Sequence, residues 1–328
     1  MRRACFFLTA IALLSSLPVS AQVASDGTVN TIVTSPDARN FTILNGTANG
    51  TNLFHSFDRF SIPTNGSATF DLINTPNIST IFSRVTGRDV SSIDGLIRAT
   101  NPVSLFLLNP NGIVLGSNAQ LNIGGSFIGT TATSIKFADG TEFSATSSTP
   151  LLTMSVPVGL QFGSNPGAIS VQDTGHTLTP RAGDFLNAIP FERQPTSGFQ
   201  VASGQTLALI GGEISAKGGI LTAEQGHIAL GSVRSPDLVR LIPTAQGYEF
   251  SYDDVSSFGD IQLSQRSLLD VSGSPAGSMQ IQARQITLQN GSLALLQNSG
   301  ASSGGSLTVV ATESIQAEGS TVPSPLNV

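Results

Sequence analysis

Residues 277–283, GSMQIQA, and residues 305–311, GSLTVVA, carry one pattern at two places that are 305 − 277 = 28 positions apart. In each copy a glycine precedes apolar residues that recur at every second position, which is the pattern of a β-strand. Residues 259–263, GDIQL, fit the same frame 277 − 259 = 18 positions earlier. Unequal spacing around a constant strand motif is typical of a solenoid in which the loops vary and the strands stack.

The segments between these strands are rich in turn-forming residues. Gly291, Gly300 and Gly304 stand there beside asparagine and serine, and these residue types favour turns over helices. A shorter cycle of the same kind runs through residues 207–231. Short strands separated by tight turns predict an all-β fold, a parallel β-helix, in which each coil must stack on its neighbours to bury enough apolar surface. A β-sandwich or a β-propeller is the alternative architecture.

The composition limits the classes of partner. The chain of 328 residues has 15 Lys and Arg against 21 Asp and Glu, a net charge of -6, and 11% charged residues, compared with ~25% in an average soluble protein. Nucleic-acid binding requires clustered cations that neutralise phosphates, and the sequence has no such cluster, so no nucleic-acid partner is expected. The 39% of hydrophobic residues indicates a folded chain rather than a disordered one.

The first segment has the features of an export signal. Two arginines follow Met1, residues 4–17 are mostly apolar, and small residues precede Gln22. This order predicts a signal peptide over residues 1–21, with cleavage between Ala21 and Gln22. The only cysteine of the chain lies in this segment, so the exported protein is expected to contain no disulfide.

A distinctive turn lies in the N-terminal part of the sequence, between two short apolar runs. Proline at its second position and glycine at its fourth are what a type I turn prefers, because proline fixes φ and glycine accepts the exit geometry. Taken by themselves, the residues predict a tight turn between two strands. They are Asn109, Pro110, Asn111 and Gly112, followed by Ile113 as the first residue of the next strand.

Several ordered motifs resemble the filamentous haemagglutinin N-terminal domain, which is the secretion domain of two-partner secretion (TPS) exoproteins. The matching segments are NPNGI at residues 109–113, LFHSF with Leu53, Phe54, His55 and Phe57, residues 85–87 and residues 93–97. Residues 207–233 and 250–288 are similar to cyanobacterial members in particular. The family's second element, NPNL, is degenerate here and contains Asn74, Pro76 and Asn77.

This resemblance implies a fold, a partner and a route of export. The implied fold is a right-handed parallel β-helix with an N-terminal β cap, in which residues 22–135 form the cap and core of the secretion domain and residues 136–328 form continuing coils. The implied route is the Sec machinery, followed by recognition of the turn at residues 109–113 by an outer-membrane TpsB-type barrel with POTRA domains. Asn74, Pro76 and Asn77 would be a secondary motif. The β-helix would then serve surface adhesion outside the cell, without enzymatic activity and without a cofactor.

The three histidines lack the sequence spacing of metal ligands. His55 lies in the LFHSF match, where a packed or capping imidazole is the expected role, and His176 and His227 lie far from it in sequence. No metal site is therefore expected. The sequence also contains no phosphate-binding glycine loop or nucleophile elbow in the required context.

Carboxylates are the candidates for an alternative function, a secreted β-helical carbohydrate-active enzyme that is a lyase or a hydrolase. Such chemistry needs acidic groups that converge on the substrate. The candidate pairs are Asp253 with Asp254 and Asp89 with Asp94. Adjacent strand residues point to opposite faces, so we expect solvated turn carboxylates rather than an acid–base pair. Three arginines are expected at the surface as ion-pair partners of Asp89 and Asp94: Arg84, Arg88 and Arg98.

Overall fold

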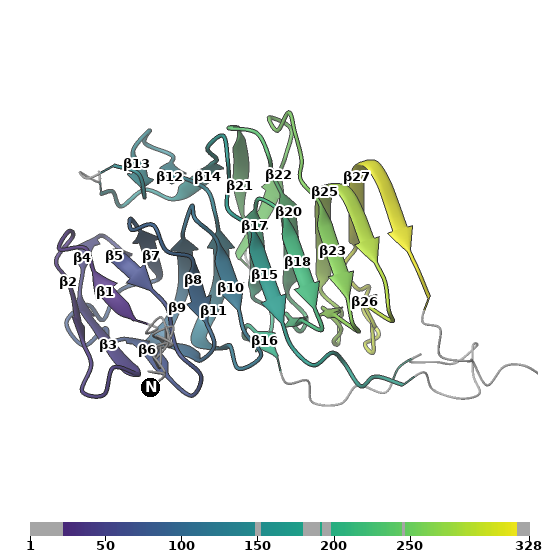
Figure 1. Cartoon of the computed structure of the whole chain (residues 1–328), viewed down its shortest axis with the longest axis horizontal. Coiled ribbons are helices and arrows are strands. Elements are labelled where there is room, and N and C mark those ends of the chain that lie inside the picture. The colour runs from purple at the N-terminus through teal and green to yellow at the C-terminus, as the bar shows by residue number, and fades with distance from the viewer. Residues whose placement is uncertain (1–21, 148–151, 180–190, 192–197, 245–246, 320–328) are drawn as a thin grey trace, which may run out of the picture.

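The computed structural model describes residues 22–147, 152–179, 191, 198–244 and 247–319. The predicted signal peptide lies outside these residues. Every element of regular secondary structure in the described part is a β-strand. Most of the strands pair in parallel, and they wind in successive coils along one axis (Figure 1). No helix in this part of the chain is long and apolar enough to cross a membrane. The fold is thus all-β, and the predicted parallel β-helix is confirmed.

Each coil has three faces, which we call A, B and C, and strands of successive coils pair in parallel on each face. Face A contains β5 (Asn52–Phe60), β7 (Thr80–Val85), β17 (Thr206–Gly211), β20 (His227–Ser232), the second halves of β9 (Leu96–Leu108) and β11 (Gln120–Thr130), and the first halves of β25 (Ser278–Leu288) and β27 (Leu307–Ala317). Face B contains β8 (Ser91–Ile93), β10 (Ile113–Leu115), β15 (Ile169–Gln172), β18 (Ile214–Lys217), β23 (Ile261–Ser264) and the second halves of β25 and β27. Face C contains β3 (Asn40–Asn45), β6 (Ser67–Phe70), the first halves of β9 and β11, and a separate sheet of β16 (Phe199–Gln200), β19 (Ile220–Thr222), β24 (Leu268–Asp270) and β26 (Leu293–Leu295).

The pairing register can be compared directly with the sequence repeat. Met279 pairs with Leu307, so the offset of 307 − 279 = 28 residues is confirmed. The 18-residue offset is wrong, because Ile261 lies on face B and pairs with Ile286, whereas Met279 lies on face A. Strands on all three faces alternate apolar and polar residues in the same way, so the pattern by itself does not tell which face a strand joins.

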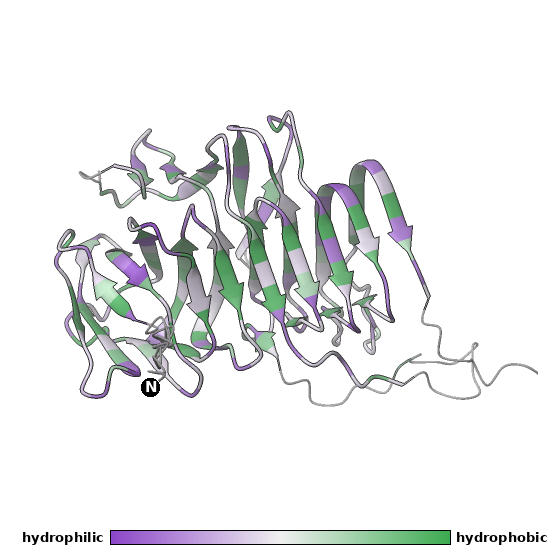
Figure 2. Ribbon diagram, in the orientation of Figure 1, coloured by the Kyte–Doolittle hydropathy of each residue, from purple (hydrophilic) through white to green (hydrophobic). Residues whose placement is uncertain are grey.

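Inward side chains form a continuous apolar core along the coil axis. On face A these side chains stack in register, and Figure 2 shows hydrophobic residues recurring on successive strands. Burial of an aliphatic or aromatic side chain contributes ~1.5–3 kcal/mol, and stacking provides this burial on every coil. The inward stack on face A is Leu53, Ile81, Leu105, Phe127, Leu207, Ile228 and Met279.

Antiparallel strands close the N-terminal end of the core. β1 (Val23–Ser25) and β4 (Thr47–Asn49) pair with β5, and β2 (Thr31–Thr34) pairs with β3. An open strand edge at this end would be a template for pairing with another chain. These strands cover the first coils, and the predicted N-terminal β cap is confirmed.

The chain leaves the coil twice at the corner between faces A and B, and both excursions contribute to a second sheet outside face A. This outer sheet is antiparallel, in the order β13 (Glu142–Ser144), β12 (Ser134–Phe137), β14 (Pro157–Gln161), β21 (Leu238–Thr244) and β22 (Gly247–Ser251). Outward side chains of face A, among them Phe54, Phe82 and Phe106, pack against it in a second core. The face A strands from β5 to β20 are therefore buried on both sides, whereas β27 is largely exposed.

The outer sheet interrupts the run of coils that we expected over residues 136–328. Its strands alternate apolar and polar residues as coil strands do, so the pattern did not distinguish them. The boundary at residue 135 stays a prediction.

Candidate functional site

The predicted turn is present at the corner between faces A and B, where β9 ends and β10 begins. The Gly112 amide donates to the Asn109 carbonyl over 3.1 Å, which closes the turn. The Asn109 side chain is fully buried, and its Oδ1 accepts the Asn111 amide at 3.0 Å. Its Nδ2 donates to the Asp89 carbonyl at 3.0 Å and to Ser91 Oγ at 2.9 Å in the preceding coil. The buried Asn109 side chain therefore stabilises the turn by hydrogen bonds within it and to the preceding coil.

The exposed part of the motif is smaller than its sequence suggests. Asn111 is exposed and Pro110 is half-buried, whereas Gly112 and Ile113 are buried. Asn111 Nδ2 donates to the Gly87 carbonyl at 2.8 Å, which holds the side chain over the corner of the preceding coil. Only Pro110 and Asn111 can be contacted by a partner without unfolding the turn.

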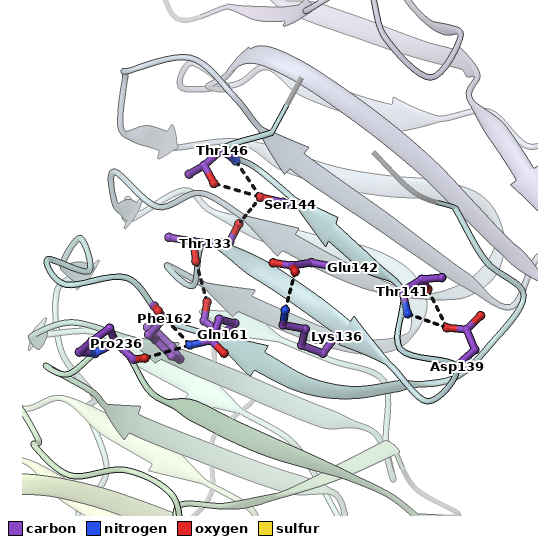
Figure 3. Close-up of polar contacts among 10 residues, drawn as sticks. All are labelled: Thr133, Lys136, Asp139, Thr141, Glu142, Ser144, Thr146, Gln161, Phe162 and Pro236. Atoms are coloured by element: carbon purple, nitrogen blue, oxygen red, sulfur yellow. Dashed lines mark hydrogen bonds and ion pairs between the residues drawn. The ribbon is translucent and has the colours of Figure 1, made fainter. Parts of the chain in front are cut away.

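A hollow of about 490 Å³ lies beside this turn. Its lining includes Asp26, Arg84, Arg88 and the turn residues Pro110 and Asn111, and the segment 145–147 after β13 completes one side. Figure 3 shows the end of β13, where the hydroxyl groups of Ser144 and of Thr146, one of the lining residues, lie 3.0 Å apart. The hollow thus lies where the N-terminal cap, the coil corner and the outer sheet meet.

Arg84 forms the floor of the hollow and is fully buried. Its guanidinium donates to Ser56 Oγ at 2.7 Å, to Thr28 Oγ1 at 3.3 Å, to the Ser147 carbonyl at 2.9 Å and to the Ser144 carbonyl. It also lies 5.1 Å from the centre of the Phe143 ring. Burial lowers the pKa of Arg84, and the charge of Asp26 opposes this shift. One side chain therefore links the cap, the coil and the outer sheet.

Asp26 is the carboxylate of this network. Burial by itself raises the pKa of Asp26, but hydrogen bonds from Ser56, Thr28 and Thr86 outweigh it and hold the pKa below its usual range. Ser56 Oγ donates to the carboxylate at 2.5 Å and accepts from Arg84, so it bridges the two charged groups by hydrogen bonds. Thr86 Oγ1 donates to the same carboxylate at 2.9 Å.

Sequence reasoning missed the roles of Arg84 and Asp26. We expected Arg84, Arg88 and Arg98 to pair at the surface with Asp89 and Asp94, and this expectation is wrong. Asp89 contacts Arg59 at 3.8 Å, and Asp94 accepts from Thr64 and from the Asn118 amide. The alternation of β7 places Arg84 on the same side of the strand as Phe82, and this was the one sign in the sequence that Arg84 could be buried. The sequence did not show that an outer sheet covers that side.

The LFHSF segment lies within β5 and is a packing element. Leu53 and Phe57 point into the coil core, whereas Phe54 points into the second core under the outer sheet. His55 is buried, with Nδ1 3.3 Å from Thr31 Oγ1 and its ring 5.4 Å from that of Phe70.

The depressed pKa of His55 predicts acid sensitivity. Burial lowers the pKa of His55 to about 3, whereas an unfolded histidine titrates near ~6.5. Its contribution to stability is thus fully present above about pH 6.5 and is lost as the pH falls towards the folded pKa. We expect His55→Gln to reduce the slope of unfolding free energy against pH, between about pH 6 and 4, by up to ~1.4 kcal/mol per pH unit. Urea unfolding at several pH values measures this slope, and an unchanged slope would show that His55 is protonated in the folded protein.

The other sequence candidates lie apart from the hollow. Asn74, Pro76 and Asn77 are exposed in the loop before β7, at the end of that strand opposite Gly87. Six strand residues separate the two ends by roughly 20 Å, so the structure does not bring the two Asn-Pro elements together.

The remaining histidines and the paired carboxylates have local partners. His176 Nε2 lies 2.8 Å from the Gly291 carbonyl, and His227 Nδ1 lies 2.7 Å from Ser278 Oγ. The described residues contain no group of three or more His, Cys, Asp or Glu that could hold a metal ion. The neighbouring carboxylates of the sequence have separate partners: Asp253 accepts from Ser251 Oγ at 2.7 Å, and Asp254 pairs with Arg240 at 2.5 Å.

Comparisons with known proteins agree with this architecture. The crystal structure of the HMW1 secretion domain from Haemophilus influenzae is similar over 91% of this chain and 82% of that chain, with a TM-score of 0.50 and 15% identity. The crystal structure of the filamentous hemagglutinin secretion domain is similar over 91% of this chain and 99% of that chain, with a TM-score of 0.51 and 14% identity. Likenesses at these identities support the fold alone. No curated protein sequence was found to match the chain.

The family assignment comes from the sequence of the whole domain. The family model of the TPS secretion domain matches residues 21–282, well over half of the 328 residues. The match includes the cap, the turn at residues 109–113 and both excursions that build the outer sheet. The chain therefore belongs to the TPS secretion domain family, the secretion domains of two-partner secretion exoproteins.

Proposed function

We propose that this domain is the export signal that an outer-membrane TpsB-type barrel with POTRA domains recognises after passage through the Sec machinery. The observation that carries the proposal is the accessible pair Pro110 and Asn111 in the hydrogen-bonded turn at residues 109–113, in a chain of this family. The signal peptide over residues 1–21, with cleavage between Ala21 and Gln22, would provide entry into the Sec route. The protein would then act outside the cell or at the cell surface.

We further propose that the coil acts as a shaft for surface adhesion. In contrast to face A, the outward side of face B is not covered by the outer sheet and carries mostly small or uncharged polar side chains. Such a surface suits display and contact rather than a charged binding patch. The residues stack in register as Ser92, Val114, Ser170, Ser215, Gln262 and Thr287.

Two finer assignments stay proposals. The loop with Asn74, Pro76 and Asn77 is exposed and would be a secondary contact for the transporter. The similarity of residues 207–233 and 250–288 to cyanobacterial members stays a prediction about origin. The enzyme alternative gains no support from Asp253 and Asp254, because they have separate partners and do not converge.

The two asparagines of the turn allow folding and recognition to be separated. Asn109→Ala removes a buried side chain and leaves the Asp89 carbonyl and Ser91 Oγ without this donor, so it should lower the unfolding free energy by ~1–3 kcal/mol. Asn111→Ala affects an exposed side chain and should change stability by less than about 1 kcal/mol. If the exposed half of the turn is recognised, Asn111→Ala should still reduce export about tenfold, which corresponds to ~1.4 kcal/mol.

The test is co-expression with a TpsB-type transporter that exports the wild-type chain, with secreted protein measured beside the urea unfolding curve of each variant. The matched control is Asn118→Ala, an exposed asparagine in the turn after β10, which should be exported like wild type. Normal export of the Asn111 variant would remove the turn from the recognition site and leave it a purely structural element.

A further inference from the structure

The coil is open at β27, its last strand, which lies at the end opposite the N-terminal cap (Figure 1). β27 pairs with β25 on one side, and among the described residues no hydrogen bond reaches it from beyond this pair. Backbone N–H and C=O groups alternate between the two sides of a strand, so about half of those in β27 face the open side. Such an edge is a template for pairing with another strand.

In contrast, the first end of the coil and the edges of the outer sheet are covered by the protein itself. β1, β2 and β4 close the N-terminal end. Side chains from the coil cap free carbonyls at both edges of the outer sheet: Arg84 donates to Ser144 of β13, and Gln280 Nε2 donates to Phe250 of β22 at 2.8 Å. The fold therefore covers exposed backbone groups in several places but leaves those of β27 open.

The open end also exposes apolar side chains of a kind that the preceding coil buries. Met279 and Ile286 of β25 are buried because Leu307 and Ile315 of β27 stack on them. Leu307 and Ile315 are themselves 46% and 54% exposed, since no strand in the described part of the chain stacks on their other side. With Val310, β27 holds three of the nine exposed large hydrophobic side chains of the described residues. Such a concentration of exposed apolar surface marks an interaction site.

Composition indicates which occupant suits this edge. Edge strands that keep other chains away carry lysine or proline, and β27 has neither. Its single charged residue, Glu313, pairs with Arg284 of β25 at 2.7 Å, and residues 307–312, LTVVAT, carry no charge and favour strand pairing. The sequence beyond β27 contains Pro323 and Pro325, which lack the amide donor of a stacked strand. An identical β27 offers a matching uncharged edge, so a second copy of the chain is the occupant that fits.

We propose that two folded copies of this chain pair end to end through β27. A two-fold axis perpendicular to the coil axis brings the two edges together with their strands antiparallel. Because the N-terminal end is capped, each copy has one open coil end, and pairing stops at a dimer instead of continuing into a filament. The inward rows of both copies then continue the core across the interface, and in each copy they are Leu307, Val309, Ala311 and Ile315.

Sedimentation velocity of the purified chain measures this association, and it does not depend on the proposed function. We expect wild type to form a species of twice the mass of one chain at micromolar concentration. Ile315→Lys places a charge on the open edge and should weaken the association at least about tenfold. The matched control is Ile32→Lys, which makes the same change at a 46% exposed position of β2 in the cap and should dimerise like wild type.

A disulfide cross-link locates the interface independently of the lysine variants. The only cysteine of the sequence is Cys5, so a chain cleaved after Ala21 carries no thiol of its own. Thr312 is the middle residue of β27, and antiparallel pairing of two whole strands places it opposite its own copy, within the range of a disulfide. Thr312→Cys should therefore give a covalent dimer on mild oxidation, whereas Ile32→Cys should not.

Several results would overturn the inference. They are a monomeric wild type, an assembly larger than a dimer, equal association of the two lysine variants, and cross-linking at position 32 but not at position 312. A dimer that appears only after removal of residues 320–328 would mean that this segment of the same chain occupies the edge, and it would overturn the inference as well. Export by the transporter is a separate measurement and is unaffected by any of these outcomes.

Discussion

Arg84→Met should lower the free energy of unfolding by about 3–5 kcal/mol, the range found when one partner of a buried charge network is removed. Methionine retains much of the side-chain volume but donates no hydrogen bond. The carbonyls of Ser144 and Ser147 then lose their donor, and Asp26 loses the nearby positive charge. Because Arg84 joins the cap, the coil and the outer sheet, we expect all three contacts to weaken together.

Urea unfolding of wild type and variant measures this effect. Arg98→Met is the matched control, since Arg98 is exposed on β9, and its effect should stay within about 0.5 kcal/mol. A loss below about 1 kcal/mol for the Arg84 variant would mean that water replaces the guanidinium without penalty and that the network is not structural.

Phe82→Ala should cost a similar ~3–5 kcal/mol and should loosen the outer sheet. Phe82 lies at the centre of the second core, with its ring 5.3 Å from Phe54, 5.0 Å from Phe106 and 5.2 Å from Phe137 of β12. Alanine leaves a cavity between face A and the sheet that covers it. The cost is large because a closely packed interior relaxes only partly around such a cavity.

The tyrosines provide a local measurement of this loosening. The chain has two tyrosines and no tryptophan, and both tyrosines, Tyr248 and Tyr252, belong to β22 or follow it directly. Their near-ultraviolet circular dichroism therefore reports on the outer sheet, and we expect it to decrease in the Phe82 variant. Ile73→Ala is the control, because Ile73 is 74% exposed and its truncation should change neither signal nor stability. An unchanged tyrosine signal together with a stability loss would place the damage in the coil instead.

Part of the fold could be predicted because its signals are local in sequence. The offset between residues 279 and 307 reflects one complete coil, and the pairing of Met279 with Leu307 agrees with it. The turn at Asn109 was readable for the same reason, because proline and glycine fix its geometry within four residues. The 18-residue offset failed because residues 261 and 279 share an alternation but lie on different faces.

The candidate site was less accessible to such reasoning. The sequence indicated the turn, but it did not show that Asn109 is buried while Asn111 is exposed. It placed Arg84 near other charged residues and suggested a surface ion pair. In the structure, the end of β13 and the segment after it, some 60 residues further along the chain, provide two hydrogen-bond acceptors for that arginine, the carbonyls of Ser144 and Ser147.

The sequence by itself determined the strand-rich character, the 28-residue length of the coil between Met279 and Leu307 and the position of the turn, because alternation and backbone preference act between residues a few positions apart. Only the tertiary structure decided which face each strand joins, where the outer sheet lies and that a hollow forms around Arg84. Alternation fixes the side of a strand to which a residue points. What packs against that side depends on segments distant in the chain, and these segments make a charged residue either a solvated surface group or the buried floor of a site.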